Sequence, residues 1–352
     1  MNISKIVWDY DREIPNPLVF PKVPSIPNSG CNLFWSVTIP VCDRIDYLEQ
    51  TISSVVSSYG EADLEVVVVD NASVLTEDII KIINKIDDSR IRHARYYERV
   101  GMAENWNRCI QSAKGEWIHI LHDDDYVRPG YYEKLKTGLA NSANYILGFT
   151  RYISVDEEGC WTGVSTLHQN KSGLLDKKFE TIIEYCGVSA PSVVVKRTAY
   201  ESVGGFFPGL QFALDWEMWK RLALVGDIYY EVEPLLCYRY HNSSETSRML
   251  KTGTYILDVY KSIYITSLLM KGDDAKYWAK RAEFRFVKTI MDMNRLVLFS
   301  RKSVVLQLMA TALSTGSTRT MALLGLSIVM LTLRIPVVLI NRGYRLLRRF
   351  GR

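Results

Sequence analysis

Hydrophobic and polar positions alternate between strand-like and helix-like patterns from about Ser36 onward. Short runs rich in β-branched residues, such as EVVVVD (65–70), are typical of strands covered on both faces of a sheet. Between them lie segments whose apolar residues recur at helical spacing. Strands are predicted at 35–41, 65–70, 90–97 and 116–121, and helices at 45–58, 76–86 and 101–113. This βαβαβαβ order predicts a mainly parallel α/β sheet with right-handed crossovers and helices on both faces.

The second half of the chain has a more mixed pattern. Strands are predicted at 144–156, 189–197 and 227–240, with a turn at Glu158-Gly159 and a helix at about 215–224. From about Thr252 onward the pattern is helical, and it ends in an apolar run at 321–340. At the other end, residues 1–32 contain five prolines, which prevent a long helix and predict an extended arm.

Composition narrows the class of protein. The chain has 352 residues, of which 47% are hydrophobic and 23% charged, as in ordinary globular proteins. A net charge of +4 is too small to indicate a nucleic-acid partner, and we expect none. The six cysteines form no CxxC pair, and the N-terminus lacks the apolar core of a signal peptide. These features favour the cytoplasm.

The C-terminal end carries positive charge without acidic residues. After Arg334 come five further arginines, Arg342, Arg345, Arg348, Arg349 and Arg352. Such a tail suits an anionic membrane surface. Because Arg334 and Pro336 interrupt the apolar run, an interfacial or core-packed helix is favoured over a membrane span. We therefore predict a protein at the inner face of the cell membrane, the alternative being a small helical domain whose apolar faces pack together.

Carboxylates follow three of the predicted strands. Asp43 follows the first strand, Asp70 ends the second, and Asp123, Asp124 and Asp125 follow the strand at 116–121. Each aspartate alone is as consistent with a turn or helix cap as with a site. Because parallel strands end at one edge, together they predict an acidic pocket there. A nucleotide could bind such a pocket only through a cation, for which Mg²⁺ or Mn²⁺ is suited. Asp70 could then accept a hydrogen bond from the base or the ribose.

These segments resemble a known family. VTIPVCDRIDYLEQTISSV, VVVVDNAS and GMAENWNRCIQSAKGEWIHILHDDDYVRPG, within residues 36–241, are similar to family 2 glycosyltransferases of the GT-A (Rossmann-like) fold. The resemblance implies a nucleotide-sugar donor, a metal site and an inverting single displacement. Together with the patterns at the two ends, it predicts an arm at 1–32, a catalytic domain at 33–245 with nucleotide-binding (33–130) and acceptor-binding (131–245) halves, and a helical C-terminal region at 246–352 with a membrane-associating basic end.

The resemblance also assigns roles to residues. The predicted nucleotide-sugar contacts are Pro40, Val41, Asp43, Asp70, Asn71, Asn105 and Asp123. Asn105 could instead be a solvent-facing helix residue. The family motif Asp-x-Asp-Asp begins here with His122, so the metal role falls on Asp124 with Asp125, and on His241. Which carboxylate touches the metal stays open, and His241 could instead be a cap or surface residue.

The acceptor side is expected around GGFFPGLQFALDWEMWK (204–220). Asp215 matches the catalytic base of the family, and its alternative role is to cap the helix that it begins. Glu217 is the second candidate base, although two residues further along a helix it would point elsewhere. The GGFFPG loop could be an aromatic platform for the acceptor or a turn with core phenylalanines.

We therefore predict an inverting hexosyl- or deoxyhexosyltransferase that builds a bacterial surface polysaccharide of the O-antigen or capsule type. The predicted acceptor is a saccharide or a polyprenyl-linked saccharide. A Mg²⁺-dependent nucleotidyltransferase is an alternative, but PVCDRIDYL lacks the glycine- and lysine-rich phosphate loop common in that class. A non-catalytic sugar-binding scaffold is the other, although it would not need Asp215 or the three aspartates.

Overall fold

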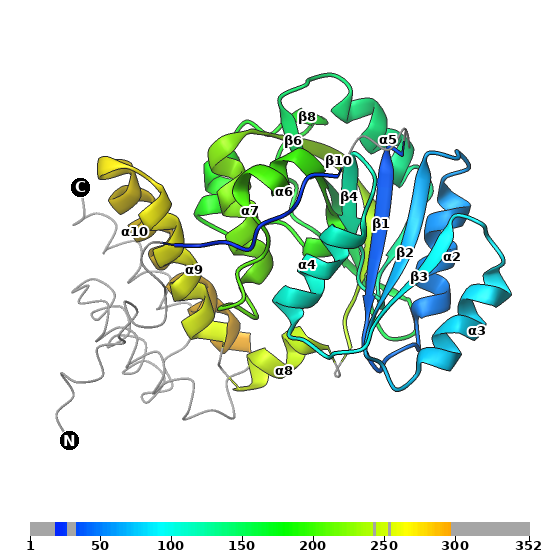
Figure 1. The fold of residues 1–352 in the computed structure, drawn as a ribbon. Helices are drawn as coiled ribbons and strands as arrows, with labels where there is room; N and C mark the ends of the chain where they lie inside the picture. The colour runs from blue at the N-terminus through cyan, green and yellow to red at the C-terminus, as the bar shows by residue number, and fades with distance from the viewer. Residues whose placement is uncertain (1–17, 27–32, 242–243, 253–254, 297–352) are drawn as a thin grey trace. The chain divides into compact units, whose positions relative to one another are not determined.

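The computed structural model describes residues 18–26, 33–241, 244–252 and 255–296. At its centre lies a ten-stranded sheet of order β3-β2-β1-β4-β9-β6-β10-β5, with β7 paired to β6 and β8 to β10 (Figure 1). The strands are β1 (Trp35–Val41), β2 (Leu64–Asn71), β3 (Ile91–Tyr96), β4 (Trp117–Ile120), β5 (Tyr126–Val127), β6 (Tyr145–Val155), β7 (Trp161–Val164), β8 (Gly173–Leu174), β9 (Val193–Lys196) and β10 (Asp227–Arg239).

The strand register brings the predicted carboxylates to one edge. β1 runs parallel to both β2 and β4, with Val41 opposite Asp70 and Thr38 opposite Ile120. The carboxyl ends of these three strands therefore meet, as the sequence predicted. The sheet is not parallel throughout, because β9 runs antiparallel to both of its neighbours, β4 and β6. The predicted α/β architecture, with strand ends that meet at one edge of a central sheet, is confirmed.

Helices cover both faces of the sheet. The helices are α2 (Leu48–Ser58), α3 (Thr76–Ile86), α4 (Met102–Ser112), α5 (Tyr131–Leu139), α6 (Arg197–Val203), α7 (Leu214–Val225), α8 (Glu245–Thr252), α9 (Tyr255–Leu269) and α10 (Gly272–Leu296). One apolar cluster joins α2, α3 and α5 to the sheet, and a second joins α4, α6 and α7 to its other face. Figure 1 shows the two groups of helices on opposite sides of the strands.

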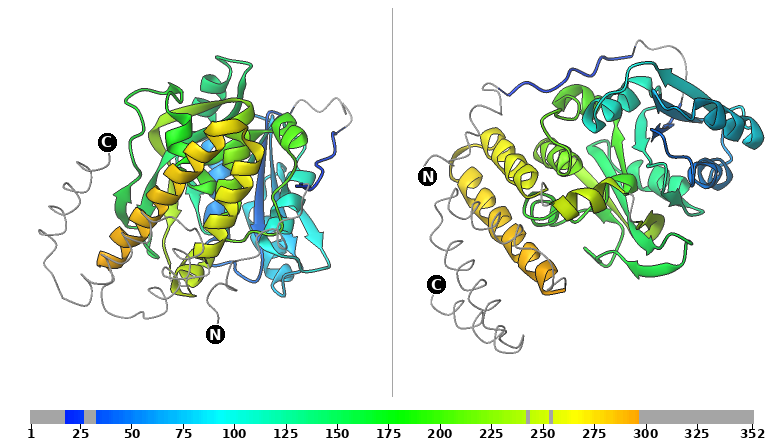
Figure 2. Two further views of the ribbon diagram at one scale, coloured as in Figure 1. Left: turned by 90° about the vertical axis from the view of Figure 1, so that its left-hand side faces the viewer. Right: turned by 90° about the horizontal axis from the view of Figure 1, so that it is seen from below.

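Element bounds differ from the predicted ones in a few places. The helix predicted at 45–58 begins at Leu48, and helices α5 and α6 and the short strands β5, β7 and β8 were not predicted. The predicted helical C-terminal region is confirmed as far as it is described, although its first helix begins earlier, at Glu245. Helix α9 packs on α7, and Figure 2 shows the two helices side by side.

The chain divides into two compact units, residues 11–282 and residues 1–10 with 283–352. The sheet, helices α2 to α9 and the start of α10 belong to the larger unit. The predicted domain boundaries at 32/33, 130/131 and 245/246 stay predictions. In the described part of the chain, no helix is both long and apolar enough to cross a membrane. The apolar run predicted at 321–340 and the arginines after it lie outside the described residues.

Candidate active site

The three aspartates after β4 form a turn that is held from two sides. From α2, the Thr51 hydroxyl donates to the carbonyl oxygen of Asp125 at 2.8 Å. From β10, the backbone N–H of Arg239 donates to Asp125 Oδ1 at 2.7 Å, and Arg239 Nε donates to the carbonyl oxygen of Asp124 at 3.0 Å. Each of the three aspartates is at most 7% exposed. The turn is thus a fixed part of the fold that holds buried carboxylates.

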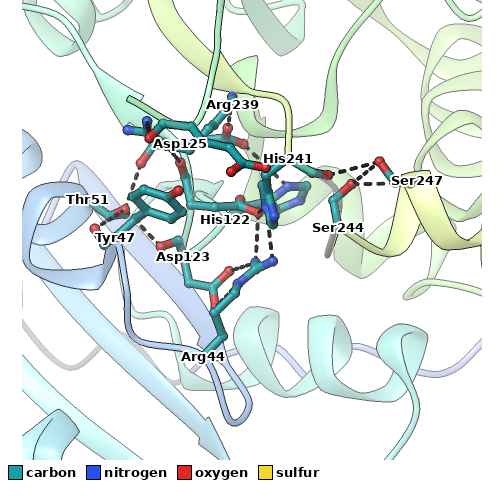
Figure 3. A network of polar contacts seen from close by, with 12 residues as sticks. Arg44, Tyr47, Thr51, His122, Asp123, Asp125, Arg239, His241, Ser244 and Ser247 are labelled. Atoms are coloured by element: carbon teal, nitrogen blue, oxygen red, sulfur yellow. Dashed lines mark hydrogen bonds and ion pairs between the residues drawn. The ribbon is translucent and has the colours of Figure 1, made fainter. Parts of the chain in front are cut away.

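Arg44 lies over the same carboxylates (Figure 3). It follows β1, and its guanidinium contacts both Asp123 oxygens and lies 2.8 Å from Asp124 Oδ2. His241, just after β10, places Nε2 2.8 Å from the same Asp124 oxygen and 3.3 Å from Arg44 Nη1. Residues from the ends of β1, β4 and β10 therefore meet at one point.

Burial is the largest influence on the pKa values of the three aspartates, and repulsion from neighbouring carboxylates adds to it for Asp123 and Asp125. Burial, together with the neighbouring Asp124, raises the pKa of Asp123 to about 6. Burial and the same neighbour raise the pKa of Asp125 well above its usual range. Burial also acts to raise the pKa of Asp124, but the hydrogen bond with His241 and the charge of Arg44 outweigh it and lower that pKa. A further cation would relieve this repulsion.

The side chains fit a divalent cation. His122, Asp124 and Asp125 each offer one ligand atom, and these atoms lie within 4.8 Å of one another. Asp125 Oδ2 and His122 Nε2 are buried and make no hydrogen bond to any residue that the structure describes, although Asp125 Oδ2 lies 3.5 Å from His122 Nδ1. Carboxylate oxygens with one imidazole suit Mn²⁺ and, less closely, Mg²⁺. We did not predict His122 as a ligand, nor Arg44 as part of the site, although a basic residue directly after a strand-end aspartate was visible in the sequence.

Asp43, at the end of β1, is joined to two neighbouring segments. Its backbone adopts a left-handed conformation with φ 56°, which non-glycine residues rarely do. Its Oδ1 accepts the Val74 N–H at 2.8 Å, and Oδ2 lies 2.7 Å from Arg99 Nη1. The hydrogen bond from Val74 is the main cause that lowers the pKa of Asp43. Of the residues before it, Val41 is fully buried and can offer a ligand only its backbone, whereas Pro40 is partly exposed.

Asp70 and Asn71, at the end of β2, are both engaged within the protein. Asp70 is fully buried, and its two oxygens accept hydrogen bonds from the Ser73 N–H at 2.7 Å and the Thr76 hydroxyl at 2.6 Å. The Asn71 amide pairs with both backbone groups of Val100, at 2.9 and 3.0 Å. In this arrangement both residues shape the turn at the strand end, so the predicted contact of Asp70 with a base or ribose would need an exchange of partners.

Asn105 faces the protein interior on α4. It is 6% exposed, so the solvent-facing alternative is wrong. Its side-chain oxygen is buried and has no hydrogen-bond partner among the described residues. Such an atom is costly to bury and can accept a hydrogen bond from a bound molecule. Its predicted contact with the nucleotide stays a prediction.

Asp215 belongs to a separate group of ionisable residues on α7. Burial raises the pKa of Asp215 to about 6 and lowers the pKa of Lys220 to about 7, and each charge acts on the other. Asp215 Oδ1 accepts the N–H of the next residue, Trp216, at 2.7 Å. The start of α7 is also held by Asp258 of α9, which accepts the N–H groups of Gln211, Phe212 and Ala213. Because Trp216 lies in the first turn of α7, its hydrogen bond to Asp215 is compatible with a capping role, so capping and catalysis both stay open for Asp215.

Two other acceptor-side expectations are settled by burial. Glu217 is fully buried and paired with Arg221 at 2.7 Å, so it is not available as a base. Phe206 and Phe207 of the GGFFPG loop are at most 5% exposed and belong to the core. The prediction that these two rings form an aromatic platform for the acceptor is therefore wrong, because the loop packs its phenylalanines inward. The backbone of Phe206 pairs with the Asn107 amide at 2.7 and 2.9 Å.

Comparison with known proteins decides the class. Residues 36–204 match the family described as Glycosyl transferase family 2. Residues 36–204 form a family 2 glycosyltransferase domain. The matched segment includes Arg44 and the three aspartates, whereas Asp215 and His241 lie beyond it.

Named relatives and solved structures agree with this glycosyltransferase assignment. The Escherichia coli protein described as UDP-Glc:alpha-D-GlcNAc-diphosphoundecaprenol beta-1,3-glucosyltransferase WfaP is 24% identical, over 65% of this chain and 86% of its own. TuaG of Bacillus subtilis, a putative teichuronic acid biosynthesis glycosyltransferase, is 27% identical over 65% of this chain and 87% of its own. The structure of S. aureus TarS in complex with UDP-GlcNAc superposes with a TM-score of 0.64 at 13% identity, covering 80% of each chain. This last likeness concerns the fold alone.

Proposed function

We propose that this glycosyltransferase is inverting and transfers a sugar from a nucleoside diphosphate sugar to an acceptor hydroxyl. The observation that carries the proposal is the buried cluster of carboxylates and imidazoles at the carboxyl edge of the sheet. In open α/β sheets this edge is where ligands bind. The diphosphate would lie at the cluster, with the nucleoside toward Asp43, Asp70, Asn71 and Asn105.

A divalent cation, Mn²⁺ or Mg²⁺, completes this site in our proposal. Asp124 and Asp125 would hold it, with an imidazole from His122 or His241. When bound, the ion supplies Lewis-acid stabilisation of the negative charge on the departing diphosphate. Asp123, whose two oxygens face Arg44, would contribute to the charge of the pocket and to donor binding rather than to ligation.

Asp215 would be the base. Its carboxylate takes the proton of the acceptor hydroxyl as the hydroxyl oxygen bonds to the anomeric carbon. The bond from that carbon to the diphosphate oxygen breaks on the opposite face, so the configuration inverts. The raised pKa of Asp215, about 6, gives the carboxylate more basicity than an exposed aspartate while leaving it mostly ionised at neutral pH.

The acceptor and the location belong to the proposal as well. The printed name of WfaP states that it acts on a diphosphoundecaprenol-linked sugar, and that of TuaG refers to teichuronic acid. We infer a saccharide acceptor, polyprenyl-linked, in the synthesis of a surface polysaccharide. An enzyme with such an acceptor would work at the cytoplasmic face of the cell membrane, bound there through its basic C-terminal region.

The test is a panel of nucleotide sugars incubated with the protein and Mn²⁺, in which the released nucleotide is identified. Release of a nucleoside diphosphate that stops with excess chelator supports the proposal. In a parallel reaction with nucleoside triphosphates and sugar phosphates, release of pyrophosphate would instead indicate a nucleotidyltransferase. No release in either reaction would favour a scaffold. Asp124→Asn should abolish the metal-dependent release. Asp78→Asn, which removes an exposed carboxylate on α3, is the matched control and should leave it unchanged.

A further inference from the structure

Two arginines meet the aspartate turn, and they are held very differently. The Arg239 guanidinium donates to the carbonyl oxygens of Asp124, Asp156 and Glu157 and to Gln50 Oε1, at 2.7 to 3.0 Å. It is part of the scaffold. In the part of the chain that the structure describes, the Arg44 guanidinium contacts only the carboxylates of Asp123 and Asp124 and the His241 ring.

Arg44 therefore has the properties of a counterion rather than of a structural brace. Its side chain is 26% exposed, whereas that of Asp123 is 9% and that of Asp124 10%. The residue follows the left-handed turn at Asp43, from which a long side chain can swing without moving a helix or strand. Among the described residues, the carboxylates of the turn and the His241 ring are all that contact its guanidinium.

The position of Arg44 conflicts with the proposed metal. Asp124 Oδ2 lies 2.8 Å from Arg44 and 2.8 Å from His241, so this oxygen already has two partners. A divalent cation ligated by Asp124 would stand within a few ångströms of the guanidinium. Like charges at that separation repel, and more strongly in a partly buried site than in water.

We propose that Arg44 is a resident counterion of the aspartate turn, which leaves Asp124 when the divalent cation binds. Without metal, Arg44 offsets part of the negative charge of the turn and so stabilises the fold. With metal, its guanidinium separates from Asp124 and is free to pair with Asp123 or with the donor diphosphate. This inference rests on the proposed function, because that function requires metal at Asp124. It makes Arg44 a positioning residue that sets how tightly metal binds before the donor arrives.

The test measures Mn²⁺ binding to the full chain without donor, from the electron paramagnetic resonance signal of free Mn²⁺. Arg44→Gln removes the competing charge, so its Mn²⁺ dissociation constant should be lower than that of the wild type by about tenfold or more, which corresponds to about 1.4 kcal/mol. Lys81→Gln removes one positive charge on α3, away from the site, and should leave the constant unchanged. Equal or weaker Mn²⁺ binding by Arg44→Gln overturns the proposal, as does the absence of binding in both proteins.

Thermal unfolding supplies an independent readout. Without metal, Arg44→Gln should melt below the wild type, and saturating Mn²⁺ should raise its melting temperature by more than that of the wild type. If Arg44→Gln does not fold, Arg44→Lys keeps the charge but cannot bridge two carboxylates, and it should bind Mn²⁺ with intermediate affinity. Wild-type affinity in the Lys variant would then overturn the proposal.

The two proposals can fail separately. Tighter Mn²⁺ binding by Arg44→Gln, with no donor turned over by the wild type, would support the counterion and refute the proposed function. Metal-dependent release of nucleoside diphosphate, with unchanged Mn²⁺ binding in Arg44→Gln, would support the proposed function and refute the counterion role of Arg44.

Discussion

At the scale of single residues, Asp215 and Lys220 are ionisable groups that burial shifts in opposite directions. They lie five positions apart on α7, with pKa values raised to about 6 and lowered to about 7. Lys220 Nζ has no hydrogen-bond partner among the described residues and lies 4.0 Å from the Trp216 ring centroid. A buried ammonium and a carboxylate that perturb each other are typical of sites that handle protons. The pKa of Asp215 is therefore a property of the proposed base that a pH profile can measure.

Asp215→Asn isolates the chemistry of this residue. The variant keeps the size and the hydrogen-bond acceptor of the side chain, and Asp258 still holds the start of α7. We expect turnover to fall by about 10² to 10⁴, the usual contribution of a general base, with donor affinity and melting temperature nearly unchanged. The wild type should give a product of inverted anomeric configuration by NMR. Near-normal turnover of the Asn variant, or a retained configuration, would exclude Asp215 as the base.

The pH profile tests the coupling to Lys220. Asp215 acts only when it is ionised, so turnover should fall as the pH drops through about 6, the raised pKa of its carboxyl. The positive charge of Lys220 opposes that rise, and Lys220→Met removes it. The acid limb of the variant should therefore move to higher pH, while Lys85→Met, an exposed control on α3, should leave it in place. An unmoved or lowered acid limb in Lys220→Met would show that Lys220 does not act on the base.

The sequence identified part of this site for clear physical reasons. Asp43, Asp70 and Asp124 stand at strand ends, and strand ends can be located from the apolar pattern alone. The counterion role of Arg44 depends on the path of a long side chain across the edge, which no spacing rule gives. The buried pairs of Asp70 and Asn71 were equally invisible, because their partners Thr76 and Val100 are ordinary residues.

At the scale of elements, the contact between α9 and α7 fixes the loop that leads to Asp215. One carboxylate oxygen of Asp258 accepts three backbone N–H groups, at 2.6, 2.5 and 3.2 Å. A carboxylate at a helix start also interacts favourably with the helix dipole. An element beyond the matched family segment thus positions the proposed catalytic base.

Asp258→Ala tests this link between the two helices. Three backbone donors, one exposed and two partly buried, lose a charged acceptor, so the free energy of unfolding should fall by about 1 to 3 kcal/mol. Turnover should fall because the start of α7 loosens, whereas the KM for the donor should stay near that of the wild type. Asp273→Ala, at the exposed start of α10, is the control and should change none of these values. A rise in donor KM with unchanged turnover would show that the link serves donor binding instead.

Local pattern also explains which elements were predicted. β1, β2 and β4 are nearly continuous apolar runs because helices cover them on both faces, so their positions could be predicted to within a residue or two. The place of β9 between β4 and β6 could not be predicted, because it depends on pairing between segments that are distant in the sequence. Helix α5 was missed because tyrosines and lysines dominate its sequence and its buried face is short.

At the scale of the whole molecule, we expect catalysis and membrane binding to belong to different parts of the chain. The larger unit contains every residue proposed for chemistry, from Arg44 to Asp258. The chain beyond it holds the apolar run at 321–340 and the arginine-rich end. A polyprenyl-linked acceptor is confined to a membrane, so an enzyme that also uses a water-soluble donor benefits from binding at the membrane surface. Apolar burial and attraction between arginines and anionic lipid would supply that binding.

Vesicle binding tests this role of the C-terminal end. We expect the full chain to bind anionic vesicles and to dissociate at high salt, since exposed charges are screened within about 8 Å at physiological ionic strength. Replacing Arg342, Arg345, Arg348 and Arg349 with glutamine should weaken binding by up to about 4 kcal/mol, at about 1 kcal/mol for each arginine near the surface. Undiminished vesicle binding by this glutamine variant would exclude the arginines as the anchor.

Truncation tests the apolar run itself. A chain that ends before Met321 should lose vesicle binding and keep its melting temperature and donor turnover. If that chain instead aggregates or melts early, the apolar run packs on the protein.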